Sequence, residues 1–302
     1  MKADKIWMDG KMIDWDDAQV HVCTHALHYG SGVFEGIRAY KTKQGTAVFR
    51  LKEHIDRLFN SAKILKMEIP FSKEEIRQAI KDTIKANKLD SCYIRPLVFR
   101  GYKELGINPF KNPVNCMIAV WEWGAYLGEE GLNKGIRVKI SSYARNYINS
   151  ASQKAKICAN YMNSIFAKME AIEAGVEEAI LLDNQGYVTE GTGENLFWIR
   201  NGEIFTTPAV TVLEGITRDS IIKIAKDLGY QVFEKYIGRD ELYIADEVFF
   251  TGTAAEVTPI REIDHYQIGE GRRGPITEKI QQKFFEIVEG KVEKYSKWLD
   301  LI

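Results

Sequence analysis

The stretch at residues 189–197, Thr-Glu-Gly-Thr-Gly-Glu-Asn-Leu-Phe, is the feature that most constrains how this chain can fold. It lies between two strand-like apolar runs, at residues 179–182 and 196–199. Two glycines flank a small threonine, so the backbone here can adopt conformations that are closed to other residues. The carboxylate of Glu190 stands immediately before this flexible point. The pattern predicts a turn between two strands, and an ordinary surface hairpin would show the same pattern.

Further sequence blocks occur upstream and downstream of this stretch. They are His25-Ala-Leu-His-Tyr-Gly, Tyr93-Ile-Arg-Pro, Gly215-Ile-Thr-Arg and Gly252-Thr-Ala-Ala-Glu. Together with Glu190-Gly-Thr-Gly-Glu-Asn-Leu-Phe, the two downstream blocks resemble the fold-type IV aminotransferases, which use pyridoxal 5'-phosphate (PLP). With the two upstream blocks, the pattern resembles the branched-chain amino acid aminotransferases specifically. The resemblance covers nearly the whole chain, and independent blocks agree in order and spacing.

The resemblance implies a two-domain protein of α/β and α+β class, D-amino acid aminotransferase-like, with the cofactor in the interdomain cleft. We expect a small N-terminal α+β domain at residues 1–122, an interdomain loop at 123–133 and a large C-terminal cofactor-binding domain at 134–302. The implied reaction passes the amino group of L-leucine, L-isoleucine or L-valine to 2-oxoglutarate, giving a branched-chain 2-oxo acid and L-glutamate. The implied assembly is a homodimer or a homohexamer built as a trimer of dimers.

Composition and charge are ordinary and exclude several other classes of protein. Of the 302 residues, 45% are apolar and 27% are charged, as in soluble globular enzymes. A net charge of −1 gives no electrostatic footprint for nucleic acid or an anionic membrane, and no apolar run approaches membrane-spanning length. The four cysteines lack C-x-x-C spacing, so we expect free thiols in a reducing cytoplasm. The histidines near Cys23 match no common ligand spacing, so no metal is expected.

Apolar periodicity predicts three helices between residues 51 and 175, of which the second is expected to be structural only. The first covers residues 51–67 and buries Leu51, Ile55, Leu58, Ala62 and Leu65. A capping box at Ser72-Lys-Glu-Glu75 opens the second. The third begins near Lys154 and ends at Gly175, and we expect it to bury one apolar face formed by Met162, Ile165, Phe166, Met169 and Ile172.

The reactive lysine cannot be chosen from the residues alone, because Lys154 and Lys156 are close neighbours. The family motif places its lysine five residues before the tyrosine of an Asn-Tyr pair, which is Lys156 before Tyr161. The resemblance then implies that Lys156 binds the cofactor covalently and moves the proton. It also implies that Tyr161 hydrogen-bonds the cofactor's phenolic oxygen and that Glu190 lies beside the pyridine nitrogen.

Arg57 and the block at Thr217 are the candidates for binding a phosphate. Arg57 stands on the flank of a predicted helix, where an arginine is normally a solvated charge. Thr217 is predicted to be the N-cap of a further helix, whose free N–H groups would form an anion site. The cofactor-binding residues implied by the resemblance are Arg57, Tyr161, Glu190, Gly193, Ile216, Thr217 and Thr253.

Arg95 is a cation inside a predicted buried strand at residues 93–99. A buried charge needs a partner, so either a structural salt bridge or a carboxylate of the substrate is expected. By resemblance, Arg95 and Tyr29 bind the distal carboxylate of glutamate, with Tyr29 reaching into a neighbouring subunit. The implied substrate-binding residues are Tyr29, Phe34, Gly36, Tyr93, Arg95, Trp123, Tyr126, Ala254 and Ala255.

Rival functions are disfavoured by particular stretches. The sequence Gly269-Glu-Gly-Arg-Arg-Gly matches G-x-G-x-x-G, but the residues before it are too polar for a buried strand, which argues against a nicotinamide dehydrogenase. The Tyr93-Ile-Arg block argues against D-amino acid aminotransferase and aminodeoxychorismate lyase. A non-catalytic binding protein would need no reactive lysine. Open points are the ranking of the three substrates, dimer against hexamer, a biosynthetic or catabolic role, and whether Cys158 senses redox state.

Overall fold

The computed structural model describes residues 3–124 and 126–302, which form two compact units. Unit 1 comprises Met1–Trp123, Ala155–Ala159 and Ile287–Ile302, and unit 2 comprises Gly124–Lys154 and Asn160–Glu286. The first boundary lies beside the predicted one. The division differs from the prediction at the two short segments that fold with unit 1 although they belong to the later part of the sequence.

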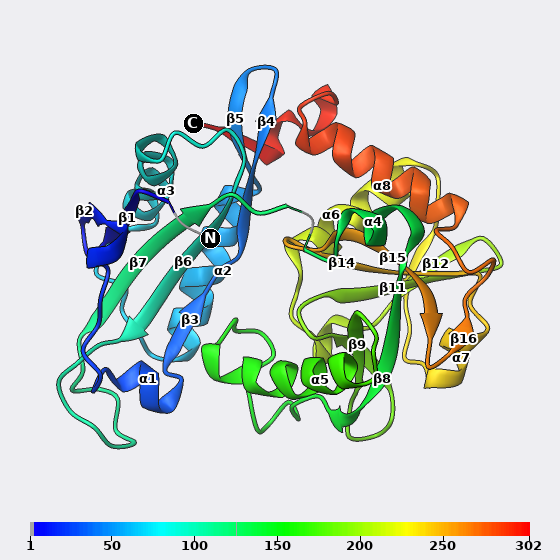
Figure 1. Ribbon diagram of the computed structural model, residues 1–302, viewed down its shortest axis with the longest axis horizontal. Helices are drawn as coiled ribbons and strands as arrows, with labels where there is room; N and C mark the ends of the chain where they lie inside the picture. Colours follow the sequence, from blue (N-terminus) through cyan, green and yellow to red (C-terminus); the bar gives the residue numbers. More distant parts are fainter. Residues whose placement is uncertain (1–2, 125) are drawn as a thin grey trace. The chain divides into compact units, whose positions relative to one another are not determined.

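Pairing with strands of unit 1 explains both segments. Ile157 forms an antiparallel bridge with Val33. The C-terminal strand β17 (Leu299–Leu301) pairs with β5 (Gly45–Phe49), as Figure 1 shows at the C-terminal end of the chain. The last residues of the chain therefore complete the first sheet.

Unit 1 is built on an eight-stranded antiparallel sheet with the order β17-β5-β4-β6-β7-β1-β2, and β3 pairs with β6 (Figure 1). Its other strands are β1 (Lys5–Met8), β2 (Lys11–Asp14), β3 (Gly32–Phe34), β4 (Ile37–Thr42), β6 (Cys92–Arg100) and β7 (Val114–Trp121). Its helices are α1 (His25–Tyr29), α2 (Leu51–Ile64) and α3 (Lys73–Ala86). The predicted strand at residues 93–99 is confirmed as β6.

Helix α2 supplies much of the core of unit 1, as its periodicity predicts. Leu51, Ile55 and Leu58 are almost fully buried and pack with residues of α3 and the sheet. Burying each such side chain stabilises the fold by about 1.5–3 kcal/mol. The capping box of α3 is confirmed, because the Glu75 amide donates to the Ser72 hydroxyl and the Ser72 amide donates to the Glu75 carboxylate.

Unit 2 is built on a nine-stranded sheet with the order β10-β9-β8-β15-β14-β11-β12-β13, and β16 pairs with β15. Its strands are β8 (Ile136–Ala144), β9 (Glu178–Leu182), β10 (Val188–Gly191), β11 (Asn195–Arg200), β12 (Glu203–Thr206), β13 (Val232–Glu234), β14 (Glu247–Gly252), β15 (Glu256–Ile263) and β16 (Tyr266–Gln267). Its helices are α4 (Glu129–Lys134), α5 (Tyr161–Glu173), α6 (Ile216–Asp227), α7 (Arg239–Tyr243) and most of α8 (Pro275–Val288).

The stretch at residues 189–197 is the hairpin that joins β10 to β11. The two strands pair at Glu190 and Asn195. Since β11 also pairs with β14, this hairpin closes a ring of strands that runs β10-β9-β8-β15-β14-β11. The glycine-rich turn therefore connects the two strands whose pairing closes this ring.

Helix α5 differs from its prediction in two ways. It begins at Tyr161 after a 3₁₀ turn at Cys158–Asn160, so Lys156 precedes the helix. The predicted buried face is wrong, because those five apolar side chains are 42–63% exposed. The buried residues are instead small: Ser164, Ala167 and Ala171, which let the helix lie close to β8 and β9.

Within residues 3–124 and 126–302, no helix combines the length and the apolar character needed to cross a membrane.

Candidate active site

Lys156 is held by its backbone in unit 1. Its amide donates to the Ser61 hydroxyl at 3.0 Å, and its carbonyl accepts from the Phe34 amide at 3.1 Å. Its ammonium nitrogen, Nζ, lies 5.0 Å from the centre of the Phe34 ring. Lys154, in unit 2, forms an ion pair of 2.7 Å with Glu214 instead. The two lysines that the sequence leaves as alternatives therefore have different surroundings.

Arg95 projects from β6 among aromatic rings. Its guanidinium carbon lies 4.7 Å from the centre of the Phe34 ring, 5.3 Å from that of Tyr93 and 6.0 Å from that of Trp121. Its Nη2 donates to the Tyr93 hydroxyl at 3.1 Å. Among the described residues no carboxylate forms an ion pair with Arg95, and its Nε is buried without an acceptor. The structural salt bridge that the sequence leaves open is thus absent from the described chain.

Gly36 and Tyr93 are in close apposition beside Arg95. A Cβ atom on Gly36 would lie 2.0 Å from the Tyr93 hydroxyl oxygen, so this position has no room for any side chain. Trp123 packs edge-on against Tyr93 with ring centres 4.6 Å apart. Unit 1 therefore gathers five of the expected substrate residues: Phe34, Gly36, Tyr93, Arg95 and Trp123.

Three further expected residues, two for the substrate and one for the cofactor, do not belong to this group. Tyr29, on α1, is 45% exposed, and its ring lies beside the rings of His25 and His28. Tyr126, in unit 2, has the ammonium of Lys168 5.9 Å from its ring centre. Tyr161 is the first residue of α5.

Arg57 is an ion-paired residue of α2, and the solvated charge typical of a helix flank is not what the structure shows. Its Nε and Nη2 donate to the two carboxylate oxygens of Glu35 at 2.7 and 2.9 Å. His54 donates from Nδ1 to the same carboxylate at 2.8 Å. Sequence reasoning missed Glu35 and His54, although the three-residue spacing of His54 and Arg57 places them on one face of the helix.

Burial and charge act in opposite directions on this cluster. Burial raises the pKa of the fully buried Glu35 carboxyl, but the charge and hydrogen bonds of Arg57, with those of His54, hold that pKa well below its usual range. Burial also lowers the pKa of His54 despite the carboxylate beside it. Glu35 is therefore a buried anion fixed by its cationic neighbour.

Glu190 is the matching buried carboxylate of unit 2, where it is held from several sides. Arg145 donates to it from Nε at 2.9 Å and from Nη2 at 2.7 Å. The Asn195 side chain and the Leu213 amide each lie 3.3 Å from its other oxygen. Arg145 was missed by sequence reasoning, since it stands in an irregular stretch with no helical or strand pattern.

The N-terminus of α6 adjoins this carboxylate through Asn195. The N-cap is Gly215, so the prediction that Thr217 is the N-cap is wrong, and Thr217 lies within the first turn. A Cβ atom on Gly215 would lie 1.9 Å from the Asn195 side-chain oxygen, so only glycine allows this approach. No side chain caps the helix, which leaves its first turn suited to an anion.

A tight turn at residues 253–255 lies at the end of strand β14, which is the neighbour of β11. It joins β14 to β15, and β14 pairs with β11 through Thr251 and Asn195. Unit 2 therefore places this turn, the start of α6 and the Glu190 carboxylate around one residue, Asn195. The expected residues in this group are Glu190, Ile216, Thr217, Thr253, Ala254 and Ala255.

Two further acids lie under the turn that contains Gly193. The Gly193 amide donates to the Glu194 carboxylate at 3.0 Å, and the Thr192 hydroxyl donates to Glu178 at 2.9 Å. Burial, together with the charge of Glu178, raises the pKa of Glu194 to about 8. The Glu194 carboxyl is thus harder to ionise than an ordinary carboxyl.

Cys158 is a poor candidate for a redox sensor. Burial raises the pKa of its thiol to about 11. The reactive form of cysteine is the thiolate, which is scarce at such a pKa.

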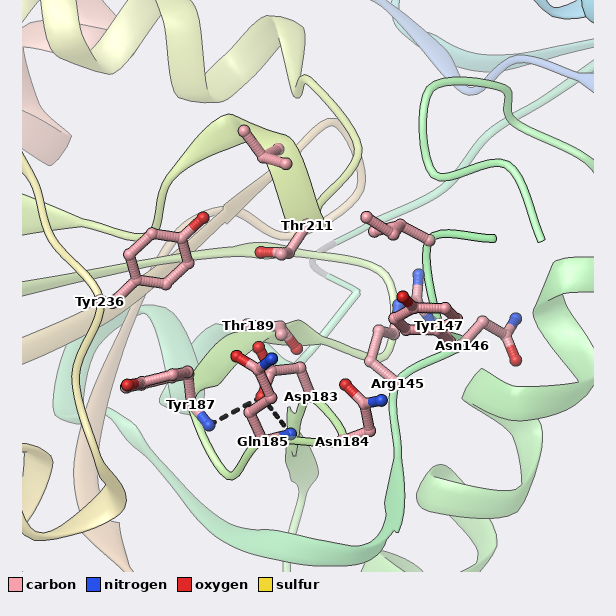
Figure 2. Close-up of a pocket in the computed structure, with 12 residues that line it drawn as sticks. Arg145, Asn146, Tyr147, Asp183, Asn184, Gln185, Tyr187, Thr189, Thr211 and Tyr236 are labelled. Atoms are coloured by element: carbon pink, nitrogen blue, oxygen red, sulfur yellow. Dashed lines mark hydrogen bonds between the residues drawn. The ribbon is translucent and has the colours of Figure 1, made fainter. Parts of the chain in front are cut away.

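A separate pocket of about 430 Å³ lies in unit 2 beside Arg145 (Figure 2). Tyr187, Thr211 and Tyr236 line it, and Glu190 is not among its lining residues. The carboxylate of Asp183 accepts hydrogen bonds from two backbone amides of its own turn, drawn as dashed lines. The Asp183 carboxylate is therefore occupied by hydrogen bonds within its own turn.

Comparison with known proteins covers nearly the full length of the chain. The profile of the Amino-transferase class IV family matches residues 32–263. The branched-chain-amino-acid aminotransferase of Pseudomonas aeruginosa is 52% identical over 297 residues, which are 98% of this chain and 97% of that protein. That of Escherichia coli K12 is 48% identical over 303 residues, with 100% and 98% covered.

Solved structures agree with the sequence comparison. The T.th. branched-chain amino acid aminotransferase complexed with N-(5'-phosphopyridoxyl)-L-glutamate has a TM-score of 0.96 at 53% identity, with 100% of this chain and 99% of that chain covered. The same enzyme complexed with 4-methylvaleric acid has a TM-score of 0.96 at 52% identity and the same coverage. The chain therefore belongs to the class IV aminotransferases and, within them, to the branched-chain-amino-acid aminotransferases.

Proposed function

We propose that this protein transfers the amino group of L-leucine, L-isoleucine or L-valine to 2-oxoglutarate, giving the branched-chain 2-oxo acid and L-glutamate. The observation that carries the proposal is Arg95, a cation without an ion pair in the described chain and surrounded by aromatic rings. Such surroundings suit both an apolar side chain and a carboxylate, as the two half-reactions require. The related T.th. enzyme, complexed once with a glutamate derivative and once with 4-methylvaleric acid, supports this dual use.

The residues present fit PLP as the cofactor. Unit 2 offers the uncapped first turn of α6, and unit 1 offers the Arg57 guanidinium, both of which suit a phosphate. Glu190 offers a buried carboxylate for the pyridine nitrogen. When bound, PLP accepts the electrons that are released as the substrate α-carbon loses its proton. Phosphopyridoxyl and pyridoxamine phosphate ligands in structures of the T.th. enzyme support this choice.

Each residue then has a definite task. Nζ of Lys156 would bind the cofactor covalently and, once the substrate amine has displaced it, would move the proton between the substrate α-carbon and the cofactor carbon C4′. Glu190 keeps the pyridine nitrogen protonated by its negative charge, and the Tyr161 hydroxyl hydrogen-bonds the phenolic oxygen. The phosphate is held by Arg57, the amides of Ile216 and Thr217, the Thr217 hydroxyl and Thr253.

The substrate is held by its carboxylates. Tyr93 and the backbone of Ala254 and Ala255 bind the α-carboxylate that all substrates share. Arg95 and Tyr29 bind the distal carboxylate of glutamate. Phe34, Gly36, Trp123 and Tyr126 form the rest of the pocket.

The lysine assignment is tested by exchanging each lysine for alanine. Lys156→Ala should abolish amino transfer while the protein stays folded. Lys154→Ala removes an exposed ion pair with Glu214 and a hydrogen bond to the Ala209 carbonyl, and it should remain active. Borohydride reduction followed by peptide mass spectrometry should place the phosphopyridoxyl group on Lys156. An active Lys156→Ala together with an inactive Lys154→Ala would show that the wrong lysine was chosen.

A substrate panel tests the reaction itself. The purified protein with PLP should form 2-oxo acids from L-leucine, L-isoleucine, L-valine and L-glutamate in stoichiometric single turnovers. D-amino acids should react poorly, if at all. Reaction with D-amino acids alone, or no amino transfer from any of these, would refute the proposal.

The exposed face of α5 supports assembly with further copies of the chain. Met162, Ile165, Phe166, Met169 and Ile172 form one apolar stripe that this chain leaves open. Contiguous apolar surface of this kind marks an interaction site. We therefore propose a homodimer or homohexamer, working in the cytoplasm, where its four free cysteines stay reduced.

Sedimentation velocity tests the assembly. Wild type should sediment as a dimer or larger, and Met169→Glu, which places a charge in the stripe, should dissociate. Ile244→Glu, at another exposed apolar position of unit 2, is the matched control and should not. A monomeric wild type with full activity would contradict the proposed assembly.

A further inference from the structure

Glu35 stands between two residues of the substrate pocket but does not share their surroundings. Phe34 has Arg95 and Lys156 over its ring, and Gly36 lies against the Tyr93 hydroxyl. The Glu35 side chain instead contacts α2, while its amide donates to the Pro96 carbonyl of β6 at 3.0 Å. The segment at residues 34–36 therefore faces the pocket on one side and α2 on the other.

One face of α2 binds this segment and the Lys156 backbone together. His54 and Arg57 hold the Glu35 carboxylate, and Ser61, one turn further on, accepts the Lys156 amide. These positions are spaced by three and four residues, so they share one side of the helix. The carboxylate of Glu35 is thus the point where the helix is joined to the pocket segment.

The contact between Glu35 and Arg57 is suited to fixing a guanidinium. Both oxygens accept from it, at 2.7 and 2.9 Å, and a two-point contact sets the plane of the group as well as its position. The carboxylate is fully buried, whereas the Arg57 side chain retains 14% exposure. Glu35 is therefore the more deeply buried member of the pair.

We infer that Glu35 is a positioning residue, which holds the Arg57 guanidinium in the orientation that binds the cofactor phosphate and ties it to the pocket segment at residues 34–36. The inference rests on the proposed role of Arg57. Glu35 itself touches neither cofactor nor substrate. Its effect should consequently be confined to ligands that carry a phosphate.

The test compares the affinities of PLP and pyridoxal, which differ by the phosphate. Dissociation constants are measured for both ligands by equilibrium dialysis, on wild type, Glu35→Gln and Arg57→Ala. Glu35→Gln should weaken the binding of PLP by about 10- to 100-fold. This is the size of the loss in affinity when a group that orients a metal ligand is removed. Pyridoxal binding should change little, so the selectivity for phosphate should fall.

Asp56→Asn is the matched control. Asp56 neighbours Arg57 on α2, but its carboxylate pairs with Lys52 and Lys73 near the surface, so this variant should keep the wild-type selectivity. If Glu35→Gln does not fold, Glu35→Asp keeps the charge and withdraws it by one methylene, with a smaller loss of selectivity expected.

The outcomes separate the two claims. An Arg57→Ala protein with wild-type selectivity would refute the phosphate role of Arg57 and with it the inference. If Arg57→Ala loses selectivity for PLP over pyridoxal and the Glu35 variants do not, the inference alone would be overturned. In the double variant Arg57→Ala/Glu35→Gln, selectivity should be no lower than in Arg57→Ala, and an additional loss would show that Glu35 acts through some other group.

Discussion

Arg57 and Arg95 are both partly buried arginines of unit 1, yet only Arg57 has a carboxylate partner in the described chain. Arg57 forms an ion pair with the fully buried Glu35. Arg95 is surrounded by the rings of Phe34, Tyr93 and Trp121. A guanidinium over aromatic faces gains some attraction without being neutralised. It can therefore remain in place whether the substrate side chain is charged or apolar, whereas Arg57 is committed to one geometry.

The largest expected effect is on stability, when the partner of Glu35 is removed. Arg57→Ala leaves a buried carboxylate without its cation and should lower the free energy of unfolding by about 3–5 kcal/mol. Arg95→Ala leaves no carboxylate of the protein without a partner, so it should lower the free energy of unfolding by clearly less. Urea unfolding of both variants at neutral pH measures the difference, and equal losses would erase the distinction between the two arginines.

The next effect is on catalysis, when the unpaired arginine is removed. With Arg95 in its proposed role, Arg95→Leu would leave the distal carboxylate of glutamate without its partner, at about 2–5 kcal/mol, so kcat/KM of the glutamate half-reaction should fall roughly 30- to 4,000-fold. The leucine half-reaction should change much less. Single-turnover kinetics measures each half, with Arg95→Lys, which keeps the charge, as the control. Equal losses in both halves would mean that Arg95 is structural or binds the α-carboxylate.

A smaller effect appears on acidification. The pKa of Glu35 is lowered in the folded protein by Arg57 and His54, so its stabilisation is present above the unfolded pKa and is lost as pH falls below it. The stability difference between wild type and Glu35→Gln should therefore shrink by about 1–2 kcal/mol between pH 6 and pH 3. Urea unfolding at several pH values tests this, and a constant difference would contradict it.

The smallest effect concerns an ion pair of the same helix near the surface. Asp56 pairs with Lys52 and Lys73, and the pKa of its carboxyl is lowered chiefly by Lys73. Asp56→Asn should nevertheless cost less than about 1 kcal/mol, because solvent screens such pairs. A loss as large as that of Arg57→Ala would show that burial is not what distinguishes Glu35.

Apolar periodicity predicted where helices form better than what covers them. For α2 the stripe of Leu51, Ile55 and Leu58 is buried as predicted. For α5 the equivalent stripe faces outward, because the small Ser164, Ala167 and Ala171 pack on the sheet. Periodicity indicates that one face of a helix is apolar. It cannot tell whether that face is buried within this chain or against another chain.

The site shows the same division between local and distant information. Motif spacing pointed to Lys156, Arg95 and Glu190, since each stands in a short recognisable block. It did not reveal that Glu35 would meet Arg57, a pairing across 22 residues that depends on how α2 lies against the sheet. Arg145, which holds Glu190 from 45 residues away, escaped notice for the same reason.

The close approach of Gly36 to Tyr93 also has a consequence for how this pocket could be altered by mutation. A methyl group at position 36 would meet both the hydroxyl oxygen of Tyr93, at 2.0 Å, and the ring carbon that carries it, at 2.9 Å. Exchanging Tyr93 for phenylalanine would remove only the first clash. A smaller residue at position 93 must therefore come before any side chain at position 36, so a mutational route to a new specificity has a fixed order of steps.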